Sequence, residues 1–95
     1  MKTLPLKLRK NGFNYTQILR GQRSCIYAQE VSENTVYFEV FILKVKPIRI
    51  IFGKIIDETE VYPNNEAFGN WAWTCRTYKS AIEKYKELER DKSND

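Results

Sequence analysis

Between residues 13 and 45 the chain alternates apolar and polar side chains in three runs, separated by residues that favour turns. The runs cover residues 13–20, 23–31 and 35–45, and the third is richest in Val, Ile, Phe and Tyr. A period of two is typical of half-buried strands, and β-branched and aromatic residues favour them. Because the turns between the runs are short, the pattern predicts an antiparallel meander.

Two-residue turns would fix the register of this meander, with Arg20 opposite Arg23 and Ser32 opposite Thr35. That register divides the side chains between two faces. The expected core face carries Ile18, Cys25, Tyr27, Val31, Val36, Phe38, Val40 and Ile42. The second face carries Tyr15, Leu19, Ile26, Tyr37, Phe41 and Leu43. Since the second face is more apolar than an open sheet face usually is, we expect it to be covered.

The segments on either side of the meander are less regular. Residues 1–12 place Leu at alternate positions and end in an Asn-Gly turn, which predicts an N-terminal arm or an edge strand. Pro5 excludes a central strand there, because proline cannot donate a ladder hydrogen bond. Residues 46–61 leave two alternatives, a fourth strand with a bulge at Gly53 or a long ordered excursion.

The C-terminal part combines a turn, a strand and a helix. Gly69 is expected to end a turn with positive φ, and residues 70–76 alternate as a strand. That alternation places Trp71, Trp73 and Cys75 on one side. Residues 78–90 then carry an apolar stripe at helical spacing, formed by Tyr78, Ala81, Ile82, Tyr85 and Leu88.

Two starts are open for this helix. Thr77 is a good N-cap, and Ser80 with Glu83 would form a capping box one turn later. In either case the segment Tyr62–Thr74, which holds both Trp residues, is expected to dock the helix onto the meander.

These patterns predict one α+β domain over residues 1–95, an antiparallel meander of three to five strands with one C-terminal helix packed on one face. Within it we expect an arm or edge strand over 1–12, mainly β structure over 13–76, the helix over 77–90 and a tail over 91–95.

The charge is divided unevenly along the chain. The net charge of +4 combines ten Lys and Arg against three Asp and Glu in residues 1–54 with six against nine in residues 55–95. A basic half suits either an anionic partner or simple solubility of a β-rich segment.

The residue types argue against an enzyme. The chain has no histidine, so the commonest general base and metal ligand are missing. Cys25 and Cys75 lack metal-site spacing and are expected to be reduced; the sequence leaves open whether they lie close together. No phosphate loop or nucleophile elbow is present. We therefore expect no catalytic residues, no metal and no cofactor.

The N-terminus offers no apolar signal region, and the longest apolar run is too short to span a bilayer. The expected setting is cytoplasmic, without membrane contact.

The function expected from these features is binding. The first hypothesis is a protein partner or a homodimer on the apolar sheet face, with Tyr15, Tyr37, Phe41 and Trp71 as contact residues. The alternative is nucleic-acid binding through the basic half, where aromatic rings stack bases and cations hold phosphates. Its candidate residues are Arg20, Arg23, Lys44, Lys46, Arg49 and Lys54.

Several motifs resemble those of a group of small uncharacterised proteins from bacteriophages and mobile elements of gut bacteria. They are Leu8–Tyr15, Ile26–Gln29, Tyr37–Phe41, Pro63–Gly69 and Trp71–Thr74 followed by the helix containing Ala81. The resemblance implies a phage-type or mobile-element context and brings no known activity, cofactor or site. The last strand and helix also resemble, in topology only, DNA readers built from a three-stranded sheet and a helix.

Overall fold

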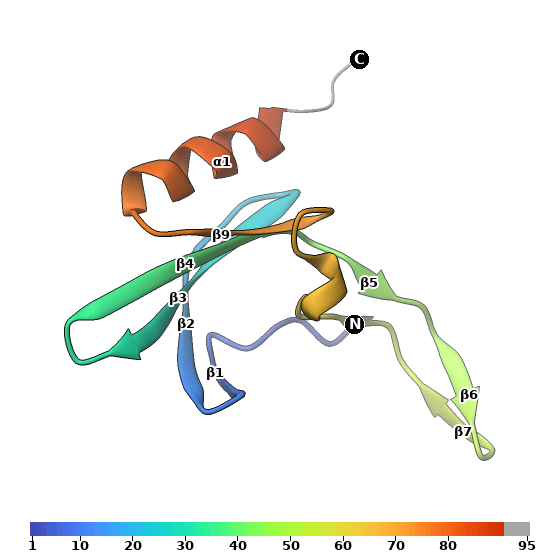
Figure 1. The fold of residues 1–95 in the computed structure, drawn as a ribbon. Coiled ribbons are helices and arrows are strands. Elements are labelled where there is room, and N and C mark those ends of the chain that lie inside the picture. Colours follow the sequence, from blue (N-terminus) through green and yellow to red (C-terminus); the bar gives the residue numbers. More distant parts are fainter. Residues whose placement is uncertain (91–95) are drawn as a thin grey trace.

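The computed structural model describes residues 1–90, and its main body is a five-stranded antiparallel sheet with one helix packed across it (Figure 1). The strand order is β1-β2-β3-β4-β9. These elements are β1 (Lys7–Lys10), β2 (Phe13–Arg20), β3 (Ser24–Ser32), β4 (Thr35–Ile42), β9 (Ala72–Cys75) and α1 (Tyr78–Arg90). The predicted fold class is therefore confirmed; the expected tail over 91–95 lies outside the described residues.

The segment between β4 and β9 leaves the sheet as a hairpin arm, which we define as residues 45–60. Its base pairs β5 (Val45–Lys46) with β8 (Thr59–Glu60), and its outer part pairs β6 (Arg49–Ile51) with β7 (Lys54–Ile56). The arm projects away from the sheet and helix in Figure 1. Of the two alternatives for residues 46–61, the ordered excursion is the one that forms. A 3₁₀ turn, η1 (Asn65–Ala67), follows the arm.

Two tight turns explain why these hairpins form where they do. Asn11 and Gly12 have φ of 53° and 84°, and Phe52 and Gly53 have φ of 51° and 79°. Two successive residues with positive φ match the twist of a two-residue hairpin, and glycine adopts that region without steric cost. Phe52 is unusual in such a turn, since a bulky side chain rarely adopts positive φ.

The predicted register is right at one turn and wrong at the other. Ser32 lies opposite Thr35 as expected, but Arg20 lies opposite Cys25 instead of Arg23. The difference at Arg20 arises because four residues, 21–24, separate it from its partner instead of two. Register shifts, one in β2 next to Ile18 and one in β3 next to Val31, then change the pairing further along the strands. A bulge inserts one extra residue, and a slip of one residue turns every following side chain to the opposite face.

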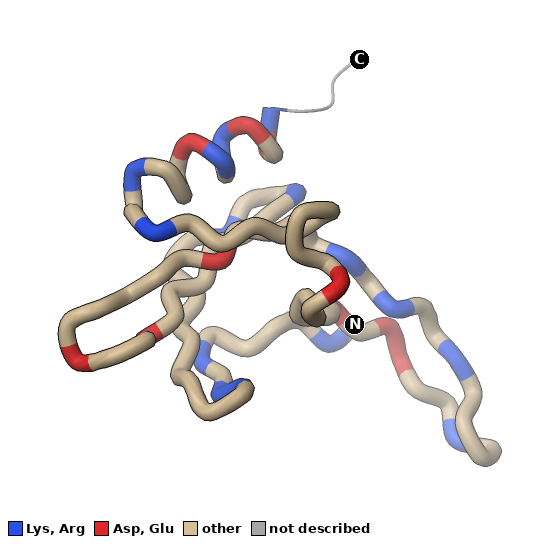
Figure 2. Tube along the Cα trace, in the orientation of Figure 1, with Lys and Arg blue, Asp and Glu red and all other residues tan. Residues whose placement is uncertain are grey.

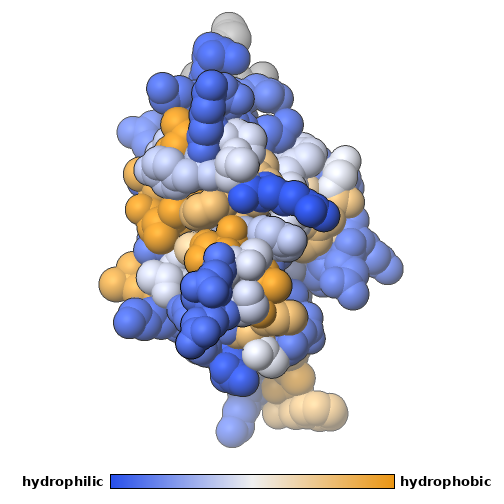
Figure 3. All heavy atoms as spheres, turned by 60° about the vertical axis from the view of Figure 1, so that its left-hand side comes forward, coloured by the Kyte–Doolittle hydropathy of each residue, from blue (hydrophilic) through white to orange (hydrophobic). Residues whose placement is uncertain are grey.

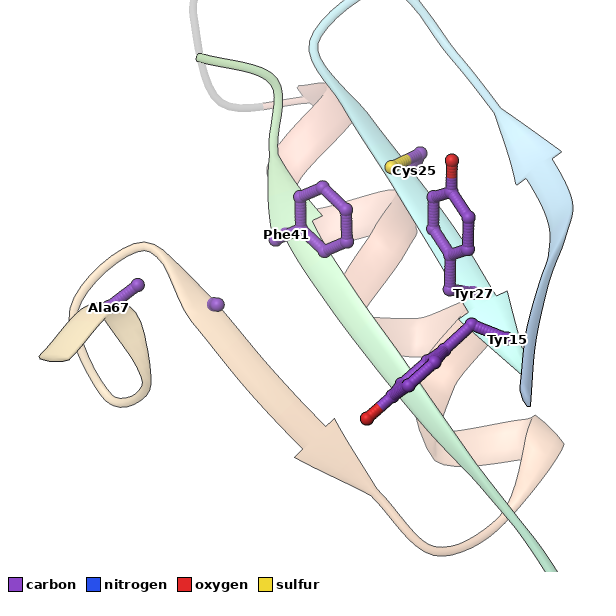
Figure 4. Close-up of a cluster of buried hydrophobic side chains, with 6 residues drawn as sticks. Tyr15, Cys25, Tyr27, Phe41 and Ala67 are labelled. Atoms are coloured by element: carbon purple, nitrogen blue, oxygen red, sulfur yellow. The ribbon is translucent and has the colours of Figure 1, made fainter. Parts of the chain in front are cut away.

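The side chains consequently sort into two layers that differ from the predicted faces. The helix-side layer joins α1 to the sheet through Ile26, Val40, Ala81 and Leu88, with Leu19, Phe38, Ile42, Trp73, Cys75, Ile82 and Tyr85 packed against them. The other layer consists of Tyr15, Cys25, Tyr27, Phe41, Ala67 and Ala72 (Figure 4). Cys25 and Tyr27 thus leave the predicted core face, and Ile18 is 40% exposed at its bulge.

The two tryptophans also separate. Trp73 and Cys75 pack on the helix side, whereas Trp71 precedes β9 and packs against the second layer. The shared side predicted for Trp71, Trp73 and Cys75 is therefore wrong for Trp71. Cys25 and Cys75 are both free thiols and belong to different layers.

The helix begins as predicted from Thr77. The Ser80 backbone N–H donates to Thr77 Oγ1 at 3.1 Å, which is the N-cap bond. At the other end the Glu89 carboxylate accepts from the N–H groups of Gln22 and Arg23 at 3.1 and 3.0 Å, and from Ser24 Oγ at 2.5 Å. The helix is thereby fixed to the β2–β3 turn.

Candidate functional site

The aromatic face proposed for partner binding is covered by the chain itself. Tyr15 and Phe41 are only 4% and 0% exposed. The Tyr62 ring lies over them, with its centroid 5.5 Å from that of Tyr15, 4.9 Å from that of Phe41 and 5.2 Å from that of Tyr27. In this fold the first two aromatic candidates are core residues, because the return segment after the arm occupies the face they were expected to offer.

The other two aromatic candidates are half-buried and lie apart. Trp71 packs edge-on against Phe41 at 6.4 Å, and Lys44 Nζ lies 5.5 Å from the Trp71 ring centre. Tyr37 sits further along β4 and carries the Arg76 guanidinium 5.3 Å from its ring centre. Each ring already holds a cation of its own chain at a distance that is favourable for a cation–π contact. The four aromatic candidates therefore form no common exposed surface.

One carboxylate beside the second layer has a raised pKa. Glu39 is 8% exposed, and its Oε1 accepts a hydrogen bond of 2.6 Å from the Tyr62 hydroxyl. Burial raises the pKa of Glu39 above its usual range, and the Tyr62 hydroxyl and the nearby Lys10 only partly offset this rise. Burial and the adjoining Glu39 also raise the pKa of Tyr62. This pair ties the covering segment to β4, so its role is structural.

The basic residues proposed for nucleic-acid binding divide into two groups. Arg20 is held by the Glu60 carboxylate, which is almost fully buried, with Nη1 donating to Oε1 at 2.9 Å and Nη2 bonded to Oε2. It is thus part of the framework. Arg23 lies in the β2–β3 turn, where its carbonyl accepts from the Leu43 N–H at 2.8 Å, close to the base of the arm.

Of the remaining four cations, three lie along the arm and one directly precedes it, as the blue segments of Figure 2 show. They are Lys44, Lys46, Arg49 and Lys54. Among the residues that the structure describes, none of these four makes a salt bridge.

The arm also exposes more apolar surface than any other part of the described chain. Phe52, at its tip, is 100% exposed, Ile50 and Ile55 are each 71% exposed, and Ile48 is 60% exposed. A large side chain of this kind normally gains about 1.5–3 kcal/mol by full burial. Burial of these side chains in an interface would therefore lower the free energy, because the folded chain itself leaves them exposed.

Apolar exposure elsewhere is more scattered. Leu6 and Met1 are 69% and 58% exposed in the N-terminal segment, and Tyr78, Val36 and Ile18 are 55%, 41% and 40% exposed on three other elements. The view in Figure 3 shows apolar side chains in small groups between hydrophilic ones. Single exposed apolar residues are normal on a protein surface, whereas a contiguous group marks an interaction site.

The base of the arm is braced by the N-terminal segment. The Lys2 N–H donates to the Glu58 carbonyl at 2.8 Å, and the Glu60 N–H donates to the Lys2 carbonyl at 2.9 Å. The Leu4 N–H donates to Glu60 Oε1 at 2.9 Å, and the N-terminal amine lies 3.2 Å from Asp57 Oδ2. The arm is thus held at its base by several bonds, which reduces the conformational entropy lost when it binds.

Sequence reasoning did not single out Ile48, Ile50, Phe52 or Ile55 as site residues. The signal was present, because a glycine follows Phe52 between two β-branched runs, which is typical of a tight hairpin turn. A hairpin with apolar side chains on both strands needs a second layer to cover it. The other apolar runs of the chain form the sheet and the helix and do not cover this hairpin.

Within residues 1–90, no group of three or more His, Cys, Asp or Glu side chains is arranged to hold a metal ion. In the same range no helix has the length and apolar character needed to cross a membrane. Comparison of the chain with protein-family models, curated proteins and solved structures finds no match in any of the three.

Proposed function

We propose that this chain is a non-enzymatic binding protein whose partner is a protein, and that the hairpin arm is the surface through which it binds. The observation that carries the proposal is the exposure of Ile48, Ile50, Phe52 and Ile55 on one braced, projecting element. Burial of apolar side chains is the main favourable term in most protein–protein association. Aromatic anchors surrounded by aliphatic residues are typical centres of such interfaces.

The apolar sheet face expected from the sequence is not available for this contact. The arm replaces that face, because Tyr15 and Phe41 are buried under Tyr62. Half-buried Trp71 and its Lys44 neighbour lie where the arm leaves the sheet, so they extend the proposed surface toward the body. The resemblance to small phage and mobile-element proteins supports an accessory role in such a setting, in the cytoplasm.

The test is affinity purification from the native host with and without nuclease, using the wild-type chain and the variant Ile50→Ser/Ile55→Ser. We expect a protein that survives nuclease treatment and is lost with the double variant. A co-purifying protein that the variant retains equally would contradict the role of the arm. The captured protein is then produced separately, and its dissociation constant for both chains is measured.

A second candidate function, nucleic-acid binding, is favoured by one observation. Lys46, Arg49 and Lys54 lie on the same projecting arm and Lys44 directly precedes it. An apolar side chain at a tip can wedge between base steps. Neutralising phosphates with four cations gives a steep dependence of affinity on salt concentration. Binding to duplex DNA that weakens steeply with salt and is lost on Arg49→Ser/Lys54→Ser would favour this second candidate.

A further inference from the structure

The outer part of the arm has two chemically different faces. Ile50 lies opposite Ile55 in the β6–β7 ladder, so these two side chains share one face. A shallow hollow there is lined by Ile48, Ile50 and Ile55 together with Arg49. Successive side chains of a strand point to opposite faces. The alternate positions, Arg49, Ile51, Lys54 and Ile56, therefore form the other face. We call the first the isoleucine face.

We propose that the isoleucine face binds the isoleucine face of a second copy of this chain, so that two arms pack against each other across a two-fold axis. The inference rests on the proposed function and names its partner. A two-fold interface uses the same patch on both copies, so the patch must complement itself. The side chains of Ile48, Ile50 and Ile55 fulfil that condition, because they carry no charge that would need an opposite charge on the second copy.

Charge favours this arrangement over other uses of the arm. The protein carries a net charge of +4, so self-association must keep its cations apart. Lys54 pairs with Ile51 and so lies on the face turned away from the proposed contact. Arg49 also lines the hollow, and its guanidinium donates to the Pro47 carbonyl at 3.1 Å. The ladder therefore keeps the Lys54 side chains of the two copies apart. A nucleic acid would instead require the cations to face the ligand together with the apolar contacts.

The available area suits a weak dimer. On the isoleucine face Ile48, Ile50 and Ile55 are 60–71% exposed. At on the order of 100 Å² for each side chain, they offer about 300 Å² per copy and about 600 Å² in a symmetric pair. That area is smaller than a standard interface, which predicts a dimer that dissociates on dilution. Because the base of the arm is already held by hydrogen bonds, little conformational entropy is lost when two arms pair.

The test is sedimentation of the nuclease-treated, full-length protein from about 1 µM to about 1 mM, a range that covers weak association. We expect the wild type to shift from monomer to dimer. The variant Ile50→Ser/Ile55→Ser removes two apolar contacts per copy and should raise the dissociation constant at least about a hundredfold. The control Ile51→Ser makes one such change on the opposite face and should leave the constant within about threefold.

Three results would overturn the inference. The wild type could stay monomeric at every concentration, or the double variant could dimerise as well as the wild type. The third is a control variant whose dissociation constant is raised as much as that of the double variant. Circular dichroism of each variant excludes unfolding as the cause. A monomeric wild type whose arm still captures a host protein, or still binds duplex DNA, separates the two proposals. In the first case only the dimer is wrong; in the second the protein-binding function is wrong as well.

Discussion

Glu60 connects three segments that are far apart in the sequence. Its carboxylate accepts from the Leu4 N–H and from both terminal nitrogens of Arg20, and its own N–H donates to Lys2. The hydrogen bond from Arg20 holds the pKa of Glu60 below its usual range, against an opposing effect of burial. At the scale of single residues, this one carboxylate sets where the N-terminus and the arm meet the sheet.

We predict that Arg20→Leu lowers the free energy of unfolding by about 2 kcal/mol, because it leaves the Glu60 carboxylate buried without its cation. The Glu60 side chain is 3% exposed and that of Arg20 is 32% exposed, so the loss should fall below that of a fully buried pair. Urea unfolding monitored by Trp fluorescence measures it. The control Arg23→Leu removes a neighbouring exposed cation and should change stability by no more than about 0.5 kcal/mol. Equal losses in the two variants would refute the role of the ion pair.

The contribution of Glu39 to folding stability should decrease as pH rises. Its pKa is raised in the fold, chiefly by burial, so the folded chain binds this proton more tightly than the unfolded chain does. The contribution of Glu39 is therefore most favourable at low pH and is lost as pH rises through the raised value.

We expect Glu39→Gln to stabilise the protein relative to wild type at pH 7 and to lose this advantage in acid, since glutamine stays neutral and still accepts from the Tyr62 hydroxyl. Urea unfolding at several pH values gives the difference between the two chains. A difference that does not change between neutral and acid pH would show that burial does not control the ionisation of Glu39. Glu30→Gln, an exposed site on the adjacent strand, is the control.

At the scale of elements, the turn at Gly69 could be predicted from the sequence. Gly69 has φ of +88°, as expected from its place at the end of a turn, and a Cβ there would meet no atom within 4 Å. Backbone conformation alone therefore decides which residue fits.

Gly69→Ala should cost about 1–2 kcal/mol of unfolding free energy, because an L-residue is strained at this positive φ while nothing else is disturbed. Gly69→Asn should cost less, since asparagine tolerates positive φ better than alanine. Thermal or urea unfolding of the three chains measures the order. An alanine variant as stable as wild type would contradict this account of the turn.

The bulges were the least predictable elements. Thr35 was correctly placed opposite Ser32, yet one extra residue at Val31 turned Cys25 and Tyr27 to the other face. Alternation along a strand tells which residues share a face only while the ladder stays regular. The extra residue carries no local signal here, because Val31 is itself a good strand residue.

At the scale of the whole molecule, the arm stands outside both side-chain layers. None of the residues that pack in either layer belongs to β6 or β7. Substitutions in β6 and β7 should therefore leave the packing of both layers unchanged.

The variant Ile50→Ser/Ile55→Ser should therefore keep the free energy of unfolding of the monomer within about 0.5 kcal/mol of wild type, as for surface substitutions in general. Core truncation at Val40, which is fully buried, is the contrasting case: Val40→Ala should lose about 2 kcal/mol or more. Both values come from urea unfolding at a protein concentration low enough to keep the chain monomeric. A double variant that unfolds as easily as Val40→Ala would mean that the arm is part of the core.

The sequence by itself determined the α+β class, the meander, the helix and the positive φ at Gly69, because each follows from local periodicity or backbone sterics. Only the tertiary structure decided between the two helix starts in favour of the Thr77 cap. It likewise decided which side chains face each other, since a longer β2–β3 turn and two bulges reset the register. It also decided that Tyr62 closes the aromatic face over Tyr15 and Phe41. Finally, it showed that the chain leaves its most apolar hairpin uncovered. Burial is a property of the whole arrangement of elements, and no local pattern specifies it.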